Sequence, residues 1–103
     1  MAEVLDVSGE VTFSNVAGLT RRLQDAFTRG HELVVDLSEV TFIDSSGLSA
    51  LLTASTTARA KGGALALVLG EGHPPSIFRF RGVDRLLALY ESRDAALAGL
   101  SGQ

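Results

Sequence analysis

The segment Asp44-Ser45-Ser46 places one carboxylate beside two hydroxyls, the residue types that accept phosphate, cap helices or form nucleophilic sites. It follows the apolar pair Phe42-Ile43, typical of the end of a strand, and it precedes a segment with helical periodicity. The first N–H groups of a helix lack intrahelical partners, and the helix dipole is positive there. We therefore expect a phosphate on Ser45 to be stabilised locally, adding about 1.5 to 2 negative charges.

The same residues have a purely structural alternative. Asp44 and Ser45 belong to the types that commonly cap a helix N-terminus. A capping hydroxyl at the exit of a strand is also open to a kinase, so the two roles can coexist. Spacing alone does not separate them.

A serine hydrolase is a further alternative, with Ser45 or Ser46 as the nucleophile. His31 or His73 would act as the base, and Asp36 or Asp44 would orient that base. The serines do not lie in a G-x-S-x-G turn, and neither histidine belongs to a motif that would bring it to Asp44. Two histidines without cysteine also make a poor metal site. We expect no enzymatic activity, no cofactor and two solvated histidines.

The composition is that of one folded domain, which we expect to span residues 1–103. The chain is 46% hydrophobic and 20% charged, far from the composition of a disordered chain. Its net charge of −3 provides no general attraction to nucleic acids or anionic lipids. The absence of cysteine excludes disulfides and thiol chemistry.

The N-terminal residues lack the basic and apolar regions of a secretory signal. The longest purely apolar stretch, residues 64–69, is far shorter than the roughly 20 residues of a membrane-spanning helix. We therefore expect a cytoplasmic protein with neither nucleic acid nor membrane as a partner.

Strands and helices are expected to alternate along the chain. Apolar runs predict strands at residues 4–7, 33–37, 64–69 and 86–90, the first of them ending in a turn at Ser8-Gly9. Helical periodicity predicts helices from Ser14 as N-cap to Gly30, and from about Asp44 to Lys61. A short helix is expected between Pro75 and Gly82, and a terminal helix after Ser92.

This order, β-α-β-α-β-α-β-α, predicts an α/β fold with a mostly parallel four-stranded sheet. In such sheets functional groups gather at the carboxyl ends of the strands. Residues 9–15 and 41–48 both fall at such ends, so a functional site is expected in these two segments.

The run Asp44-Ser45-Ser46-Gly47-Leu48, preceded by Phe42-Ile43, resembles the signature of the STAS-domain anti-sigma factor antagonists. Ser8-Gly9-Glu10-Val11 is similar to the Gly-Glu-Leu-Asp turn of that family, and Gly62-Gly63 is similar to its glycine pair. The last predicted strand and helix fit as well, so the resemblance covers nearly the whole chain.

The resemblance implies a bacterial partner-switching module that regulates transcription. The unmodified form would bind an anti-sigma factor that is also a serine kinase, and so free a sigma factor. Phosphorylation of Ser45 with ATP would release the antagonist, and a serine phosphatase would restore it. The partner-binding residues implied are Asp44, Ser46, Gly47, Leu48, Gly9, Glu10, Thr12 and Ser14. The resemblance also implies that residues 9–15 lie beside the segment that contains Asp44.

The chain departs from the family pattern in two places. Thr12 stands where the family commonly has an acidic residue, which affects the partner contact expected there. The extra N-terminal strand of many members is missing, so one sheet edge is expected to be free for homodimerisation or for pairing with another chain.

Other interaction roles remain open at this point. A STAS-like domain can also serve as an assembly subunit of a stress-sensing or lipid-transport complex. Separately, Arg79, Arg81 and Arg85 form a basic cluster flanked by Phe78 and Phe80, which suits an acidic partner, a nucleic acid or an ordinary solvated helix face. At least one of the two aromatic side chains is expected to be partly exposed.

Overall fold

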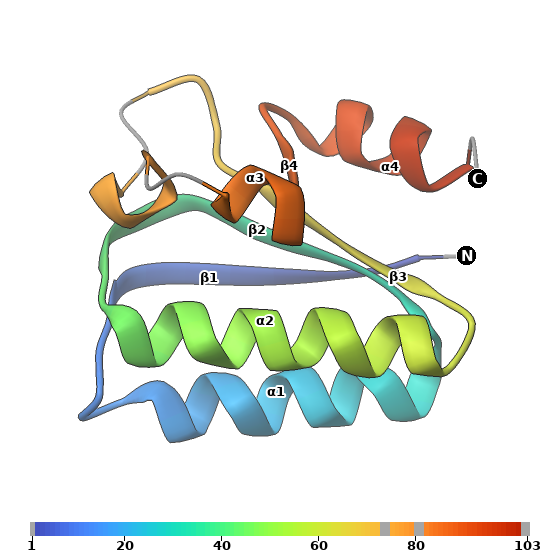
Figure 1. Cartoon of the computed structure of the whole chain (residues 1–103), viewed down its shortest axis with the longest axis horizontal. Coiled ribbons are helices and arrows are strands. Elements are labelled where there is room, and N and C mark those ends of the chain that lie inside the picture. The colour runs from blue at the N-terminus through green and yellow to red at the C-terminus, as the bar shows by residue number, and fades with distance from the viewer. Residues whose placement is uncertain (1, 73–74, 80–81, 102–103) are drawn as a thin grey trace.

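The fold alternates strands and helices around one parallel sheet (Figure 1). The computed structural model describes residues 2–72, 75–79 and 82–101. The strands are β1 (Glu3–Val11), β2 (Glu32–Ile43), β3 (Ala64–Val68) and β4 (Ala88–Tyr90). The helical elements are α1 (Val16–Arg29), α2 (Ser45–Ala60), the 3-10 turn η1 (Ser76–Arg79), α3 (Val83–Leu86) and α4 (Arg93–Ser101). The strands pair in parallel in the order β1-β2-β3-β4, which confirms the predicted fold class.

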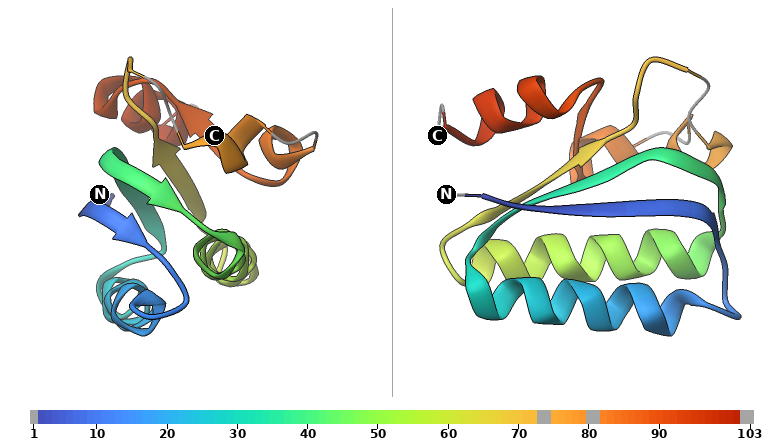
Figure 2. Two further views of the ribbon diagram at one scale, coloured as in Figure 1. Left: turned by 90° about the vertical axis from the view of Figure 1, so that its left-hand side faces the viewer. Right: turned by 180° about the vertical axis from the view of Figure 1, so that it is seen from behind.

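The helices divide between the two faces of the sheet (Figure 2). Helices α1 and α2 lie side by side on one face, and η1 and α3 pack into the same hydrophobic cluster through Phe78 and Val83. This is expected when successive parallel connections share one right-handed sense. Helix α4 covers the opposite face, where Ala96 and Leu100 contact Val34.

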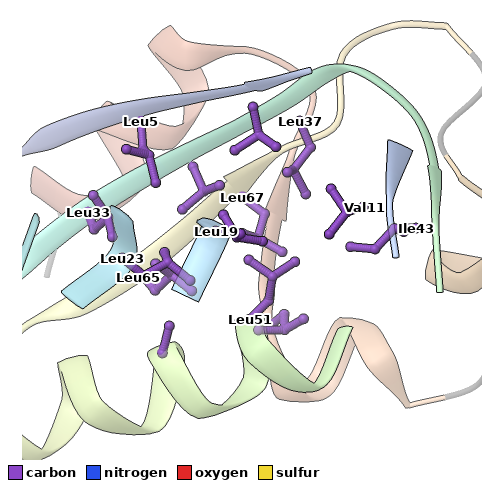
Figure 3. Packing of buried hydrophobic residues seen from close by; sticks show 14 of the residues in the cluster. Leu5, Val11, Leu19, Leu23, Leu33, Leu37, Ile43, Leu51, Leu65 and Leu67 are labelled. Atoms are coloured by element: carbon purple, nitrogen blue, oxygen red, sulfur yellow. The ribbon is translucent and has the colours of Figure 1, made fainter. Parts of the chain in front are cut away.

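Strand β3 and residues 33–35 of β2 are apolar because both faces of the sheet are covered there. Alternate residues of β2, such as Leu33 and Leu37, point into the larger cluster with Leu51 of α2 (Figure 3). Val34, on the other face, packs beneath α4. The continuous apolar runs that predicted these strands therefore reflect burial on two sides.

The predicted turn at Ser8-Gly9 is wrong, because β1 continues through it to Val11. The pairing of β1 with β2 shifts register between Asp6 and Ser8 and again between Gly9 and Glu10. Gly9 adopts a φ of 76°, a left-handed conformation that glycine tolerates without steric penalty. The glycine marks an irregularity inside a long strand. β1 lies at one edge of the four-stranded sheet.

Several helix boundaries differ from the predicted ones. Asn15, and not Ser14, is the N-cap of α1. Gly82 (φ 89°) begins α3 instead of ending a helix that starts near Pro75, so the last strand starts only at Ala88. The predicted cap at Ser92 is confirmed, since its Oγ accepts a hydrogen bond of 3.1 Å from the N–H of Ala95.

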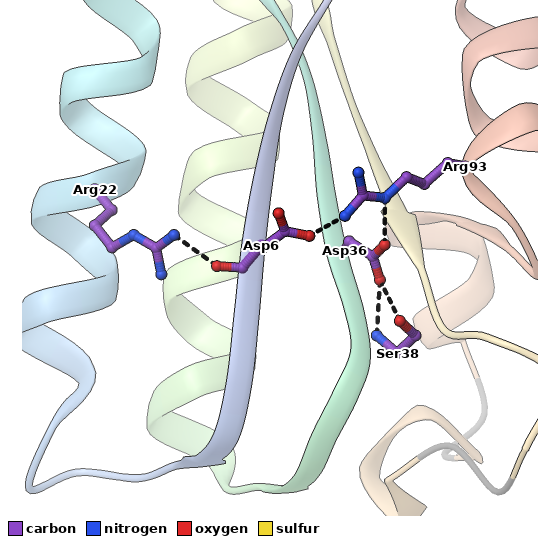
Figure 4. Close-up of polar contacts among 5 residues, drawn as sticks. All are labelled: Asp6, Arg22, Asp36, Ser38 and Arg93. Carbon is purple, nitrogen blue, oxygen red and sulfur yellow. Dashed lines mark hydrogen bonds and ion pairs between the residues drawn. The ribbon is translucent and has the colours of Figure 1, made fainter.

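A polar cluster fastens α4 to the sheet (Figure 4). Asp36, only 8% exposed, accepts hydrogen bonds from Ser38 N (2.9 Å), Ser38 Oγ (2.6 Å) and Arg93 Nε (2.6 Å). Arg93 also pairs with Asp6 on β1. Burial raises the pKa of Asp36, but the hydrogen bonds from Ser38 and Arg93 outweigh it and hold this pKa below its ordinary value.

Within the described ranges, no helix combines the length and apolar character needed to cross a membrane.

Candidate functional site

The carboxyl ends of β1 and β2 bring the two predicted segments together. Val11 and Ile43 are the last registered pair of these strands. Directly beyond them, the N–H of Asp44 donates to the carbonyl oxygen of Val11 over 3.1 Å. The expected proximity of residues 9–15 and 41–48 is therefore confirmed. We call residues 12–15 the Phe13 loop and residues 44–48 the Asp44 turn.

Asp44 is the central polar side chain of this site. Its Oδ1 accepts hydrogen bonds from the N–H groups of Ser46 (2.9 Å) and Gly47 (3.1 Å), so Asp44 is the N-cap of α2. Its Oδ2 accepts a 2.9 Å hydrogen bond from the N–H of Phe13. The bond from Phe13 does most to hold the pKa of Asp44 below its ordinary value, assisted by those from Gly47 and Ser46 against a smaller opposing effect of desolvation. One carboxylate thus serves both the helix and the Phe13 loop.

These bonds correct one expectation about the helix N-terminus. The N–H groups of Ser46 and Gly47 are not free to receive a phosphate, because Asp44 already occupies them. The N–H of Leu48 bonds to the carbonyl oxygen of Asp44 over 3.1 Å. A phosphate on Ser45 would therefore meet a carboxylate that competes for the same donors.

Ser45 is the first residue of α2, and its side chain is exposed. Because the side chain of Asp44 makes the cap bonds, capping makes no demand on the Ser45 hydroxyl. Ser46, one position further on, is half-buried. Of the two hydroxyls in the turn, that of Ser45 is the more accessible.

Gly47 is buried and is required by packing. A Cβ on Gly47 would lie 2.4 Å from Cγ1 of Ile43 and 2.8 Å from Cγ1 of Val11. Leu48 is half-buried and packs against the core. Both residues position the turn, and direct contact of either with a partner stays a prediction.

Hydrogen bonds within residues 10–15 hold the Phe13 loop in place. Asn15 accepts from the N–H of Thr12 through Oδ1 (2.8 Å) and donates through Nδ2 to the carbonyl oxygen of Glu10 (2.9 Å). The hydroxyls of Thr12 and Ser14 lie 2.8 Å apart. Gly9, Glu10 and Ser14 are exposed, as surface residues of a docking site must be.

Phe13 is the residue that sequence reasoning missed. Its side chain is 81% exposed, and Phe42, two positions before Asp44, is 47% exposed. The signal was an aromatic residue in a polar turn between a strand and a helix. Two exposed aromatic residues near one serine suit a protein interface.

A groove between α1 and α2 beside the turn is lined by uncharged side chains. The groove has a volume of about 260 Å³, and its lining residues are Val16, Thr20, Ser46, Ser49, Ala50 and Thr53. Along α2, residues 45–58 include no charged side chain. A phosphate added at Ser45 would therefore dominate the local charge of this surface.

Among the described residues, those needed for a hydrolase are not brought together. His31 is exposed at the start of the 12-residue strand β2, whereas Asp44 follows its end. Asp36 is engaged with Ser38 and Arg93. In the part of the chain that the structure describes, no three histidine, cysteine or acidic side chains come together as a metal site. His73 lies outside the described residues.

The structure describes only part of the basic cluster around Arg79 and Arg85. Arg79 and Arg85 are exposed, whereas Phe78 is buried in the core. Arg81 and Phe80 lie outside the described residues.

Comparison with known proteins agrees with the fold and the motif. The family model described as "Mlab, STAS domain" matches residues 1–89. No curated protein sequence matches the chain significantly.

Among solved structures, the chain is similar to an anti-sigma factor antagonist from Mycobacterium paratuberculosis, at 26% identity, with a TM-score of 0.79 and coverage of 97% of this chain and 86% of that one. A Thermotoga maritima protein described as a candidate anti-sigma factor antagonist superimposes with a TM-score of 0.85 at 20% identity, covering 97% and 87%. The murine anion transporter Slc26a9 has the same fold, with a TM-score of 0.75 at 19% identity, covering 99% of this chain but 18% of the transporter.

Proposed function

The chain belongs to the STAS domain family, and from this we propose that it is a phosphorylation-controlled protein-binding switch of the anti-sigma factor antagonist type. The unmodified chain, acting as one STAS domain over residues 1–103, binds an anti-sigma factor that is also a serine kinase. The kinase transfers the γ-phosphoryl group of ATP to Ser45 Oγ, leaving ADP and a proton, and the complex separates. A serine phosphatase hydrolyses the phosphoester and restores the binding form. The exposed hydroxyl of Ser45 at the start of α2 carries the proposal.

The local charge explains how the modification would release a partner. Residues 45–58 and the groove beside Ser46 are uncharged, so a partner that fits them has no cation to match there. A phosphate adds about 1.5 to 2 negative charges that lose hydration when the interface closes. The modified surface therefore disfavours the same partner without a change of fold.

Phosphorylation mapping tests the acceptor. The purified chain is incubated with ATP and each kinase-type anti-sigma factor of the organism that encodes it, and the modified residue is located by mass spectrometry. We expect one phosphate, on Ser45. Ser46→Ala should still be modified and Ser45→Ala should not. Phosphate on another residue, or none with any such kinase, would refute the assignment.

Binding measurements test the switch itself. Isothermal titration with the same kinases should show that Ser45→Ala retains binding after incubation with ATP, whereas Ser45→Asp has lost it. If Ser45→Asp and the truly phosphorylated chain bind as tightly as the unmodified chain, the switch is wrong.

A second candidate function is that of an assembly subunit in a stress-sensing or lipid-transport complex. It is favoured by the description of the matching family model and by the occurrence of this fold as a small part of a transporter chain. The genes adjacent to this one distinguish the two candidates. A kinase-type anti-sigma factor supports the switch, and a transport ATPase supports the assembly subunit.

A further inference from the structure

Phe13 is an exposed aromatic side chain on an ordered loop. It is 81% exposed, the largest value among the exposed large hydrophobic residues of the described chain. The N–H groups of Asn15 and Val16 bond to the carbonyl oxygen of Thr12 at 3.0 Å and 2.8 Å. With the two bonds of the Asn15 side chain, they close the Phe13 loop against the end of β1. Loops held in this way lose little conformational entropy when they bind.

A hydrogen bond between residues far apart in sequence links the Phe13 loop to the Asp44 turn. Phe13 N and Asp44 Oδ2 are 2.9 Å apart, although 31 positions separate the two residues in sequence. The other oxygen of the same carboxylate holds the first turn of α2, which begins at Ser45. A change in the position of Asp44 is therefore felt by both segments.

We propose that Phe13 is the apolar anchor that inserts into a pocket of the protein partner, and that Asp44 couples this anchor to the modification state of Ser45. The proposal rests on the proposed function, because a phosphate on Ser45 is its input. The occupant of the partner's pocket is the Phe13 ring, and the surrounding contact is the groove beside Ser46, which is lined by uncharged side chains.

The coupling follows from competition between two anions. A phosphate on Ser45 lies one residue from the Asp44 carboxylate and seeks the same N–H donors of Ser46 and Gly47. Like charges at this spacing repel, and the phosphate carries the larger charge. Displacement of Asp44 removes the acceptor of the Phe13 N–H. The loop then loses its link to the turn, so the Phe13 side chain is positioned less firmly before docking.

A measurement without any partner tests the coupling. Hydrogen exchange of the Phe13 amide is followed by NMR in the unmodified chain, in Ser45→phosphoserine and in Asp44→Asn. Asparagine is as good an N-cap as aspartate, but its Nδ2 cannot accept from Phe13. We expect both changes to accelerate exchange of this amide about fivefold or more, as expected for the loss of one hydrogen bond.

Ser49→phosphoserine is the matched control, because Ser49 is also exposed on α2 but lies one turn beyond the cap. Exchange at Phe13 should change less than about twofold in this control. Unchanged exchange in Ser45→phosphoserine, or equal acceleration in both phosphoserine chains, would overturn the coupling.

A binding measurement tests the anchor. The probes are the purified kinase-type anti-sigma factors used above. Phe13→Ala should weaken binding about 30-fold or more, as loss of an interface anchor does. Leu97→Ala is the control, because Leu97 is 38% exposed on α4, on the opposite face of the sheet, and it should change binding less than about twofold. Phe13 is too exposed for its removal to unfold the chain.

The two proposals fail in different ways. If Ser45 is phosphorylated and controls binding but Phe13→Ala binds normally, the anchor is refuted and the switch stands. If no kinase-type anti-sigma factor binds the unmodified chain, the proposed function is refuted together with the anchor. The exchange of the Phe13 amide still decides the coupling in that case.

Discussion

Gly47 provides the sharpest test of the packing that positions the switch. In Gly47→Ala the new methyl group would lie 2.4 Å from Cγ1 of Ile43, 2.8 Å from Cδ1 of Ile43 and 2.8 Å from Cγ1 of Val11. Carbon atoms in contact are normally about 3.5–4.0 Å apart, so these neighbours must move by about 1 Å. Ile43 and Val11 are each only 3% exposed and have little room to move.

The magnitude follows from two opposing effects. Overpacking of a buried site typically destabilises by about 1–3 kcal/mol, and contacts with two branched residues place this substitution in the upper part of that range. Replacing glycine by alanine within a helix returns about 1 kcal/mol. We expect a net loss of about 1–2 kcal/mol in the free energy of unfolding, which lowers Tm by about 5–10 °C in a domain of this size.

Gly18→Ala is the matched control within α1. Gly18 is exposed, and a Cβ there would meet no atom within 4 Å. Only the helix-propensity effect remains, so this variant should be more stable by about 0.5–1 kcal/mol. Urea unfolding followed by circular dichroism measures both variants. If Gly47→Ala is as stable as the unsubstituted chain, the contacts inferred at the start of α2 are not restrictive and the argument fails.

Three further perturbations address the α4 side of the sheet. The pKa of Asp36 is held below its ordinary 3.8, so the stability that this ionised carboxylate provides is complete above pH 3.8 and is lost as the pH falls below that value. Urea unfolding between pH 7 and pH 3 should show this decrease in the free energy of unfolding, and the decrease should be smaller in Asp36→Asn. Leu100→Ala removes a side chain that is 6% exposed and should destabilise by about 2–3 kcal/mol, whereas Leu97→Ala should change stability by less than about 0.5 kcal/mol, and equal effects would contradict the orientation of α4. In Gly99→Ala the new Cβ would overlap the Tyr90 hydroxyl, so hydrogen exchange in α4 should accelerate relative to that in α2, and unchanged protection would refute this contact.

Local patterns predicted the elements of this fold well where one physical cause dominates. The buried strands at residues 33–37 and 64–69, the limits of α2 and the cap at Ser92 each follow from burial or from capping chemistry. Gly9 was misjudged, because a glycine that favours a turn locally can be carried into a strand by long-range pairing with β2. Gly82 was misjudged in a similar way, since a left-handed glycine can precede a helix as well as follow one.

The proximity of the two candidate segments was expected, but the hydrogen bonds between them were not. Strand order alone brings residues 9–15 beside 41–48. The bond between Phe13 N and Asp44 depends on the tertiary meeting of two loops, and no local pattern encodes it. The bonds from the N–H groups of Ser46 and Gly47 to Asp44 are local instead, and they follow from the capping role that the residue type of Asp44 indicated.

The order of the strands also has a practical consequence for engineering. The Phe13 loop and the Asp44 turn follow β1 and β2, and Glu71 and Gly72 are exposed after the neighbouring strand β3, at the same carboxyl end of the parallel sheet but outside the two switch segments. A fluorescent label or an inserted epitope between Glu71 and Gly72 should thus report on complex formation while leaving the two switch segments undisturbed. Biosensors can be built at that position without redesign of the recognition end.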